Sequence, residues 1–304
     1  MGMEILVKIL VTGAQGFIGR HVCAKLQEQG HDVYAPGREE LGDLEVTRDF
    51  FSILAGIEVV VHLAARVHLR GDAEKFHQVN VEASKALAEQ AALSGVKRFI
   101  FMSSVGVYGE LTTPKIISEA DKPSPKTDYE ISKWQAEQEL RAVAQRSTME
   151  LVILRPCLVY GAGVRANFAS LLKMVAKGIP LPFGSVHNMR SMLYVGNLAQ
   201  VVSLCISSPA AADEVFLVAD EQAISTADLV RKMAKLLDKN PNWAAIKFPL
   251  FALRCLGKLT GRELMVQRII GSLEVDISKV KQKLNWSPAY TMEEGLVETV
   301  KWWR

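Results

Sequence analysis

Two residues four positions apart, Tyr129 and Lys133, have side chains suited to acid–base chemistry. On a helix this spacing places both side chains on one face. An ammonium group beside a phenol favours the phenolate, so it lowers the pKa of the phenol from its ordinary value of about 10 toward neutrality. A neighbouring hydroxyl could share the transferred proton, and Ser103-Ser104, directly after a predicted strand, supplies two. The same spacing is common on solvated helices, so whether this pair is catalytic depends on the elements that surround it.

A glycine motif comes early in the chain, where Gly13, Gly16 and Gly19 follow the apolar run Ile5–Val11 and open the helical pattern of Gly16–Gln29. The first glycine permits a tight turn, the second lets a pyrophosphate approach the backbone, and the third lets helix and strand pack closely. The amino terminus of the helix offers free N–H groups to the anion. The motif predicts dinucleotide binding, and the alternative is a turn with only a structural role.

The residues after the second predicted strand, Asp32–Ala35, bear on which dinucleotide binds. An acidic side chain there accepts hydrogen bonds from the ribose 2′-hydroxyl, whereas an arginine accommodates a 2′-phosphate. Gly37 stands at the expected acidic position and Arg38 follows it. Arg38 therefore favours NADP(H), with NAD(H) possible; the alternative is that Arg38 is a solvated loop residue.

Strands and helices alternate along the first half of the chain. The predicted strands there are Ile57–Ala64, Arg98–Met102 and Leu151–Leu154, and the predicted helices are Phe76–Leu93 and Tyr129–Gln145. This alternation predicts an α/β fold with a doubly wound parallel sheet of the Rossmann type. We expect an NAD(P)-binding Rossmann domain over residues 1–165 and a smaller C-terminal α/β substrate-binding lobe over residues 166–304, whose elements can interleave. The helices predicted after residue 165 are Phe168–Lys177, Val195–Ser207, Ser225–Asp238, Lys279–Leu284 and Glu293–Trp302.

The composition excludes several classes of protein. Of the 304 residues, 49% are hydrophobic and 23% are charged, which rules out a disordered chain and a small disulfide scaffold. A net charge of +3 is too small to indicate a nucleic-acid partner. No apolar run approaches the roughly 18 residues of a membrane-spanning helix, and we expect a cytoplasmic protein without a metal site. The cysteines lie in apolar stretches, which predicts buried free thiols at Cys23, Cys157, Cys205 and Cys255.

Together these motifs resemble the extended short-chain dehydrogenase/reductase family, in its NAD-dependent epimerase/dehydratase group. The resemblance covers nearly the whole chain and extends to Asp43-Leu44, Val61-His62-Leu63-Ala64-Ala65, Asn80, Ser103 to Gly109, Leu154-Arg155-Pro156, Tyr160-Gly161, Arg190 to Val195, and Asp276 to Gly295. The chain departs from the family at Leu158, where many members carry asparagine, and at Gly196-Asn197, where an acidic pair is usual. The segment from Val164 to Asn197 is most similar to bacterial UDP-4-ketosugar reductases and UDP-sugar 4-epimerases of polysaccharide biosynthesis.

The resemblance implies a role for each matching residue. Tyr129 would be the general acid/base, Ser104 would hydrogen-bond the substrate, and Lys133 would hold the nicotinamide ribose beside Tyr129. The implied cofactor-binding residues are Gly13, Gln15, Gly16, Phe17, Ile18, Gly19, Arg38, Asp43, Leu44, Leu63, Ala64, Ala65, Tyr129 and Lys133. The implied substrate-binding residues are Ser103, Ser104, Asn167 and Arg190, whose fixed positive charge suits a nucleotide-sugar diphosphate.

Three functions are compatible with these residues. The favoured one is an NADPH-dependent reductase of a UDP-4-keto-6-deoxy-N-acetylhexosamine, because reduction consumes a cofactor that Arg38 suits. A UDP-hexose or UDP-N-acetylhexosamine 4-epimerase would instead retain NAD and consume none. A non-enzymatic NADP(H)-sensing regulator on the same fold is the third. The family resemblance also implies a homodimer through the helices Phe76–Leu93 and Tyr129–Gln145.

Overall fold

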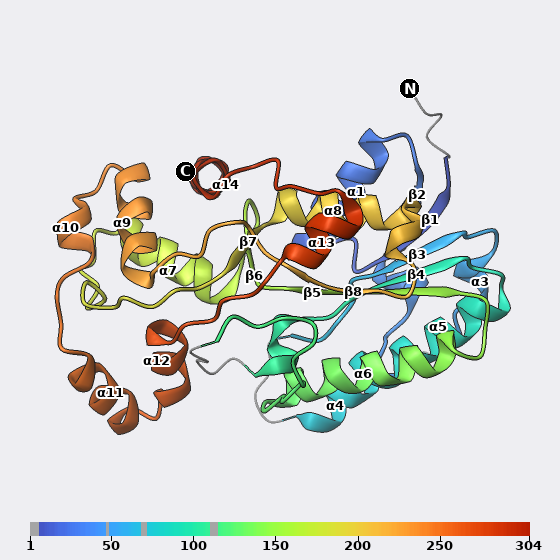
Figure 1. Ribbon diagram of the computed structural model, residues 1–304, viewed down its shortest axis with the longest axis horizontal. Helices are drawn as coiled ribbons and strands as arrows, with labels where there is room; N and C mark the ends of the chain where they lie inside the picture. The colour runs from blue at the N-terminus through green and yellow to red at the C-terminus, as the bar shows by residue number, and fades with distance from the viewer. Residues whose placement is uncertain (1–5, 47–48, 68–71, 110–114) are drawn as a thin grey trace.

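The computed structural model describes residues 6–46, 49–67, 72–109 and 115–304. They form a larger lobe built on a six-stranded sheet and a smaller lobe at one end of it (Figure 1). Helices cover both faces of this sheet, which confirms the predicted Rossmann-type α/β fold. Among the described residues, no helix combines the length and the apolar character that crossing a bilayer requires.

All six strands of the main sheet run parallel, in the order β2-β1-β3-β4-β5-β8. Their bounds are β1 Lys8–Thr12, β2 Asp32–Tyr34, β3 Val59–His62, β4 Arg98–Met102, β5 Glu150–Pro156 and β8 Val215–Val218. Strand β4 has the predicted bounds, whereas β1 begins later than the apolar run Ile5–Val11, whose Ile5 lies outside the described residues. The chain winds outward in both directions from β1, so the carboxyl ends of β1 and β3 border the crevice where such sheets bind ligands.

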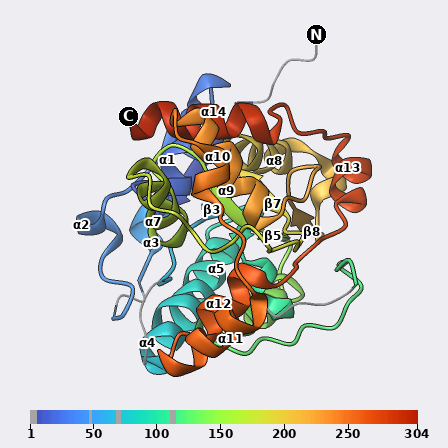
Figure 2. The ribbon, with the colours of Figure 1, turned by 90° about the vertical axis from the view of Figure 1, so that its left-hand side faces the viewer.

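Alternating side chains give the sheet two separate cores, one on each face. Ile9 and Val11 pack on the first face and Leu10 and Val60 on the second. The helices of the first face are α1 Phe17–Glu28, α8 Val195–Ser207 and α13 Ser278–Leu284. Those of the second face are α3 Phe51–Leu54, α5 Ala83–Leu93 and α6 Asp128–Ala144. Figure 2 shows α1 and α8 on one side of the strands and α5 on the other.

The predicted helix Phe76–Leu93 is interrupted by a wider turn. It consists of α4 (Ala73–His77), a π-helical turn η1 (Gln78–Glu82) and α5. The π turn places Asn80 inside the fold, fully buried. Such turns are rare and occur often at functional sites.

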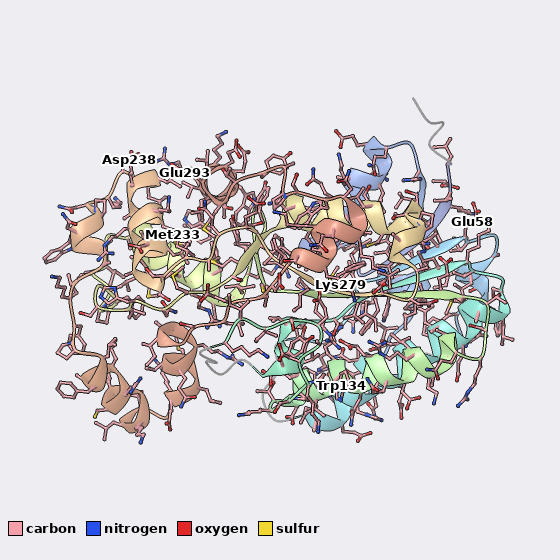
Figure 3. All side chains as sticks on the ribbon, in the orientation of Figure 1. Glu58, Trp134, Met233, Asp238, Lys279 and Glu293 are labelled. Atoms are coloured by element: carbon pink, nitrogen blue, oxygen red, sulfur yellow. The ribbon has the colours of Figure 1, made fainter. Side chains whose placement is uncertain are left out.

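The smaller lobe is built around a second, two-stranded parallel sheet. Its strands are β6 Leu158–Tyr160 and β7 Met192–Tyr194, and its helices are α7 Ala166–Ala176, α9 Thr226–Leu236, α10 Pro241–Ala244, α11 Leu250–Leu259, α12 Glu263–Ile270 and α14 Met292–Trp303. Met233 lies at its core, and Lys232 pairs with Glu293 to join α9 to α14 (Figure 3). Because β5 leads directly into β6, this lobe lies at the carboxyl edge of the main sheet.

Besides α13, two segments after residue 165 return to the larger lobe. Strand β8 closes the main sheet beside β5, and α8 packs on α1. The sequence prediction includes α8 with its observed bounds but not β6, β7, β8 or α10 to α12. The remaining short elements are α2 Arg38–Leu41 and the 3₁₀ turns η2 Val105–Tyr108 and η3 Pro209–Ala211.

Candidate active site

A capping box fixes the first turn of α6, which carries Tyr129. The Thr127 hydroxyl accepts a hydrogen bond from the Glu130 amide at 3.4 Å, and the Glu130 carboxylate accepts one from the Thr127 amide at 3.0 Å. Glu130 is itself buried, so the helix start is anchored to the interior. Tyr129 is half-buried, with its ring edge-on to Phe76 at a centroid distance of 6.3 Å. The helix therefore holds Tyr129 in a defined place.

One helical turn later, Lys133 reaches the carboxyl end of β4. Its Nζ donates to the carbonyl oxygen of Met102 at 2.8 Å and lies 4.6 Å from the centre of the Phe101 ring. Only 2% of Lys133 is exposed. Burial lowers the pKa of the Lys133 ammonium to about 7, and the charge of Glu137 opposes this shift. Below about pH 7 the protein thus holds a positive charge beside the Tyr129 turn, at a cost in desolvation.

Ser104 lies directly after β4 and caps the 3₁₀ turn η2. Its Oγ accepts from the amide of Gly106 at 3.0 Å, which leaves the hydroxyl proton available to a ligand oxygen. A Cβ at Gly106 would lie 3.0 Å from Cγ of Glu130, so this turn packs against the start of α6. The structure thereby brings Ser104, Tyr129 and Lys133 to one strand end.

Ser103 points the other way, into the interior. Its hydroxyl donates to Glu137 at 2.5 Å, and Glu137 forms a bidentate ion pair with Arg155, in which Nε lies 2.9 Å from the carboxylate. Arg155 also donates to the Tyr108 hydroxyl and lies over that ring. All members of this network are buried. Sequence reasoning missed it, although Glu137 follows Lys133 by four residues on the same helix face.

His62, at the end of β3, is a buried, packed histidine. Its ring nitrogens lie 2.6 Å from the Thr12 hydroxyl and 2.9 Å from the Ser84 hydroxyl. Burial, with the charge of Lys133 added, lowers the pKa of His62 to about 3. His62 therefore stays neutral and keeps the carboxyl ends of β1 and β3 together.

Asn80 connects the strand ends to the helix of Tyr129. Its side chain pairs with the backbone of Arg66, accepting from N at 2.8 Å and donating to O at 3.1 Å. It also donates to Ser132 Oγ at 2.9 Å, and Ser132 in turn donates to the Tyr129 carbonyl at 2.8 Å. The π turn thus positions a buried amide between the loop after β3 and the start of α6.

The glycine motif forms the tight turn from β1 into α1. Gly13 has φ +72°, and a Cβ there would lie 2.7 Å from the backbone nitrogen of Ala64. A Cβ at Gly19 would lie 2.2 Å from the Gly13 carbonyl oxygen. No side chain caps α1, and its first turn holds no acidic residue, so its N–H groups face outward unopposed. These residues fit the diphosphate of a dinucleotide.

The end of β2 lies beside this turn. A Cβ at Gly37 would approach Nε2 of Gln15 to 3.4 Å. The Arg38 guanidinium is exposed and pairs weakly with Asp43 at 3.5 Å. Leu44 packs against the core of the second face, and the Ala64 amide, in the loop after β3, donates to the Thr12 hydroxyl at 3.3 Å. Asp32 opens β2, so it lies at the opposite end of the strand from the ribose position.

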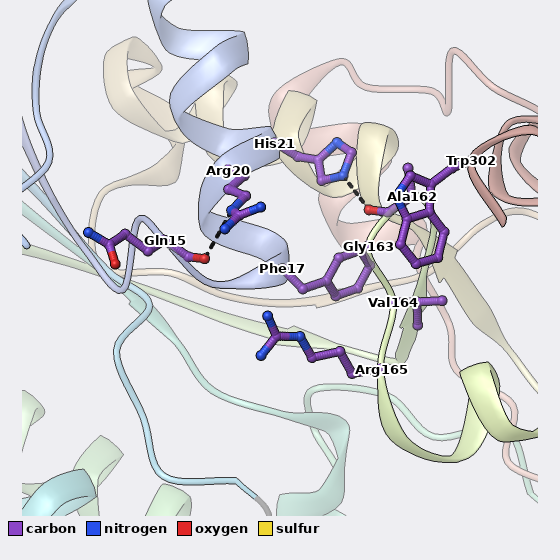
Figure 4. A pocket seen from close by; sticks show the side chains of 9 residues that line it. All are labelled: Gln15, Phe17, Arg20, His21, Ala162, Gly163, Val164, Arg165 and Trp302. Atoms are coloured by element: carbon purple, nitrogen blue, oxygen red, sulfur yellow. Dashed lines mark hydrogen bonds between the residues drawn. The ribbon is translucent and has the colours of Figure 1, made fainter.

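A pocket of about 360 Å³ lies between the start of α1 and the loop after β6 (Figure 4). It is lined by Gln15, Phe17, Arg20, His21, Ala162, Gly163, Val164, Arg165 and Trp302. His21 bonds the Ala162 carbonyl at 2.8 Å and Arg20 donates to the Gln15 carbonyl at 3.1 Å. Arg165 extends beneath Phe17 toward α1, and its side chain forms no hydrogen bond or ion pair within the described ranges. Arg165 is a cation that the sequence prediction missed.

The two predicted substrate residues of the smaller lobe lie in different settings. Asn167 is exposed in the first turn of α7. Arg190 is half-buried, and its Nη1 donates to the carbonyl oxygens of Arg268 at 3.0 Å and Gly271 at 3.1 Å. Arg190 therefore holds the end of α12 against the segment that leads into β7. Of the cysteines, Cys157 and Cys205 are buried and Cys23 is half-buried; the expectation is wrong for Cys255, which is exposed because α11 turns this side outward.

Comparison with known families gives this arrangement a context. The model of the NAD dependent epimerase/dehydratase family matches residues 9–219, which include the glycine motif and the Ser104, Tyr129 and Lys133 site. The chain belongs to this family. It is therefore an enzyme that uses a nicotinamide dinucleotide.

The alignments with known relatives cover nearly the full length of this chain. A "UDP-glucose 4-epimerase" of Vibrio cholerae is 42% identical over 311 residues, which cover 96% of this chain and 94% of that protein. An "N-acetyl-alpha-D-glucosaminyl-diphospho-ditrans,octacis-undecaprenol 4-epimerase" of Escherichia coli O157:H7 is 29% identical over 97% of this chain and 94% of its own length. Among solved structures, "MoeE5 in complex with UDP-glucose and NAD" is 27% identical, with a TM-score of 0.80 over 98% of both chains. A UDP-glucuronic acid 4-epimerase of Bacillus cereus with NAD is 25% identical, with a TM-score of 0.79 over 97% of this chain and 98% of the other.

Proposed function

We propose that this epimerase/dehydratase family member inverts C4 of a UDP-hexose and retains NAD while it does so. The observation that carries the chemistry is the cluster at the end of β4, where a buried Lys133 stands one helical turn from Tyr129 and beside the Ser104 turn. The identity of 42% with a UDP-glucose 4-epimerase supports the position on the sugar. A structural neighbour in complex with UDP-glucose and NAD supports the substrate class and the cofactor.

Three side chains of this protein act in the reaction at C4 of the sugar. Tyr129, as phenolate, takes the proton of the C4 hydroxyl, while the Ser104 hydroxyl donates a hydrogen bond to the same oxygen. The Lys133 ammonium favours the phenolate through its charge. The bound dinucleotide supplies the hydride acceptor and donor that inversion requires. Tyr129 then returns the proton once the sugar has presented its other face, and such acid–base catalysis contributes about 10²–10⁴-fold.

In this proposal the diphosphate of the dinucleotide and the diphosphate of the UDP-sugar bind to different residues of the chain. The uncapped start of α1 receives the dinucleotide, with Arg165 as a further cation at its edge. Asn167 and Arg190 bind the UDP-sugar. Ser103 acts through Glu137, because its hydroxyl is directed into the interior, and therefore positions the strand end.

Arg38 is the one feature that favours NADP(H). It lies where a 2′-phosphate would, but its guanidinium is largely exposed and already faces Asp43. The named neighbours hold NAD, so we propose NAD as the retained cofactor. The reductase, which the sequence favours on the strength of Arg38, finds no support in these relatives, and the intact catalytic cluster argues against the regulator. The homodimer through the α4–α5 and α6 helices stays a prediction.

The deciding experiment uses the purified protein with no added nucleotide. UDP-galactose is supplied, UDP-glucose is followed by NMR, and the nucleotide released on denaturation is identified by mass. The proposal expects interconversion and about one NAD per chain. It fails if turnover requires added NADPH, which is consumed one for one with a UDP-4-ketosugar, because that result identifies the reductase. Bound nucleotide with no turnover of either substrate class would identify the regulator.

A further inference from the structure

The helical hairpin of α11 and α12 presents an apolar outer face. Phe251, Cys255 and Leu259 follow one another at intervals of four, so they form one stripe along α11. Phe251 is 72% exposed and Leu259 is 85% exposed. Leu264 and Met265, at the start of α12, are also exposed. Figure 1 places the hairpin at the end of the molecule away from the main sheet.

This outer face is not needed to hold the hairpin in place. The inner face does that, since Leu253, Val266 and Ile269 pack into the core of the smaller lobe. The two helices touch closely at Gly257, where a Cβ would lie 2.8 Å from the Val266 side chain. The exposed apolar residues are therefore available to something outside the chain.

Basic residues flank the stripe. Arg254 and Lys258 are exposed on the same side of α11 as Phe251. Residues 240–270 contain five basic residues and one acidic residue, a net charge of +4, whereas the whole chain carries +3. The rest of the protein is thus slightly acidic, and the positive charge is concentrated on this one segment.

We propose that the α11–α12 hairpin docks on an anionic lipid surface. Helices that lie in a membrane interface combine aromatic and leucine side chains on one side with lysine and arginine beside them, which is the composition of this face. A second copy of the same face is disfavoured, because two surfaces of like charge would meet. The inference is independent of the substrate and reaction proposed above.

Cys255 makes the docking measurable in the full-length protein. Of the four cysteines it is the exposed one, and it lies one turn from both Phe251 and Leu259. An environment-sensitive fluorophore on Cys255 should shift to the blue with vesicles of phosphatidylcholine containing about one third phosphatidylglycerol. Pure phosphatidylcholine vesicles and high salt should each weaken binding, since every basic residue near an anionic surface contributes about fivefold.

Two double variants separate the apolar and the charged contributions. Phe251→Ser with Leu259→Ser should lower the vesicle-bound fraction by about tenfold or more in sedimentation, and Arg254→Glu with Lys258→Glu should abolish the preference for anionic vesicles. Leu93→Ser, at a leucine 79% exposed at the end of α5, is the matched control and should bind as the unsubstituted protein does. Neither double variant touches the site, so turnover of soluble UDP-sugar should be unchanged.

Three results would overturn the proposal. One is the absence of vesicle binding by the unsubstituted protein at low salt. Another is binding that the Leu93 control loses equally. The third is a dimer in light scattering that the Phe251 and Leu259 substitutions dissociate, which would assign the face to a second copy of the chain.

Discussion

Replacing Lys133 by methionine should make the folded protein more stable near neutral pH, although it removes a residue proposed for catalysis. Burial lowers the pKa of the Lys133 ammonium from its ordinary 10.5 to about 7. Unfolding returns the amine to water, where it recovers its ordinary affinity for a proton. A difference of about 3.5 pKa units corresponds to a desolvation cost of about 5 kcal/mol for the charged form.

The pH dependence follows from the proton count. Between about pH 7 and pH 10.5 the unfolded chain binds more protons at this site than the folded one, so the stability of the unsubstituted protein rises with pH there. Below about pH 7 Lys133 is charged in both states, and the folded protein bears the full desolvation cost of the buried ammonium. Methionine avoids it but leaves the Met102 carbonyl without its donor, at about 1–3 kcal/mol. The variant should therefore be more stable by about 2–4 kcal/mol at about pH 6, and about 3 kcal/mol of that advantage should be lost by about pH 9.

Urea unfolding of the nucleotide-free proteins from about pH 6 to about pH 9 measures this difference directly. Subtracting the two unfolding free energies cancels the groups that titrate alike in both proteins. Lys177→Met is the control, because Lys177 is exposed and its charge stays in water in both states. A difference between the Lys133 variant and the unsubstituted protein that does not change with pH would refute the reasoning, since it would mean that burial imposes no cost on this ammonium.

Three further predictions concern the supports of the site. Gly19→Ala should cost about 2–3 kcal/mol in urea unfolding, because its Cβ would lie 2.2 Å from the Gly13 carbonyl oxygen; a neutral effect would mean that the turn can widen freely. Glu137→Gln should cost about 3–5 kcal/mol by leaving Arg155 buried without a carboxylate, whereas Glu139→Gln, on the same helix α6, breaks only a half-exposed pair with Lys85 of α5 and should cost less than about 1 kcal/mol; equal costs would refute this reasoning. Arg38→Ala should weaken NADP(H) binding more than NAD(H) binding in calorimetric titration of the nucleotide-free protein, and an equal effect on both would remove Arg38 from the ribose site.

The sequence predicts the Rossmann half well, because its elements are long and bounded by glycine. Strand β4 and helix α8 have their predicted bounds, since each is a continuous apolar or periodic run. Strands β6, β7 and β8 span only three or four residues, and unlike the equally short β2 and β3 they lie outside the regular alternation of strands and helices in the first half of the chain. The hairpin of α11 and α12 is missed because its outward apolar face blurs the helical pattern.

The residues of the candidate site are also predicted only in part. Tyr129 and Lys133 are found from their spacing and Ser104 from the family resemblance, and the structure places all three at one strand end. The pair of Glu137 and Arg155 is not found, because the two residues are 18 positions apart on different elements and only folding buries them together. Arg165 is also not predicted, because the direction of a side chain in a loop depends on the folded path of that loop, and only the structure shows that Arg165 extends toward α1.

The most direct test of the account is the turnover of the Tyr129→Phe variant with UDP-galactose and no added cofactor. We expect a loss of about 10²–10⁴-fold in rate, with the amount of bound nucleotide per chain unchanged. Tyr34→Phe, at a half-buried tyrosine bonded to Glu40, should keep full activity. Undiminished turnover by the Tyr129 variant would show that another group transfers the proton.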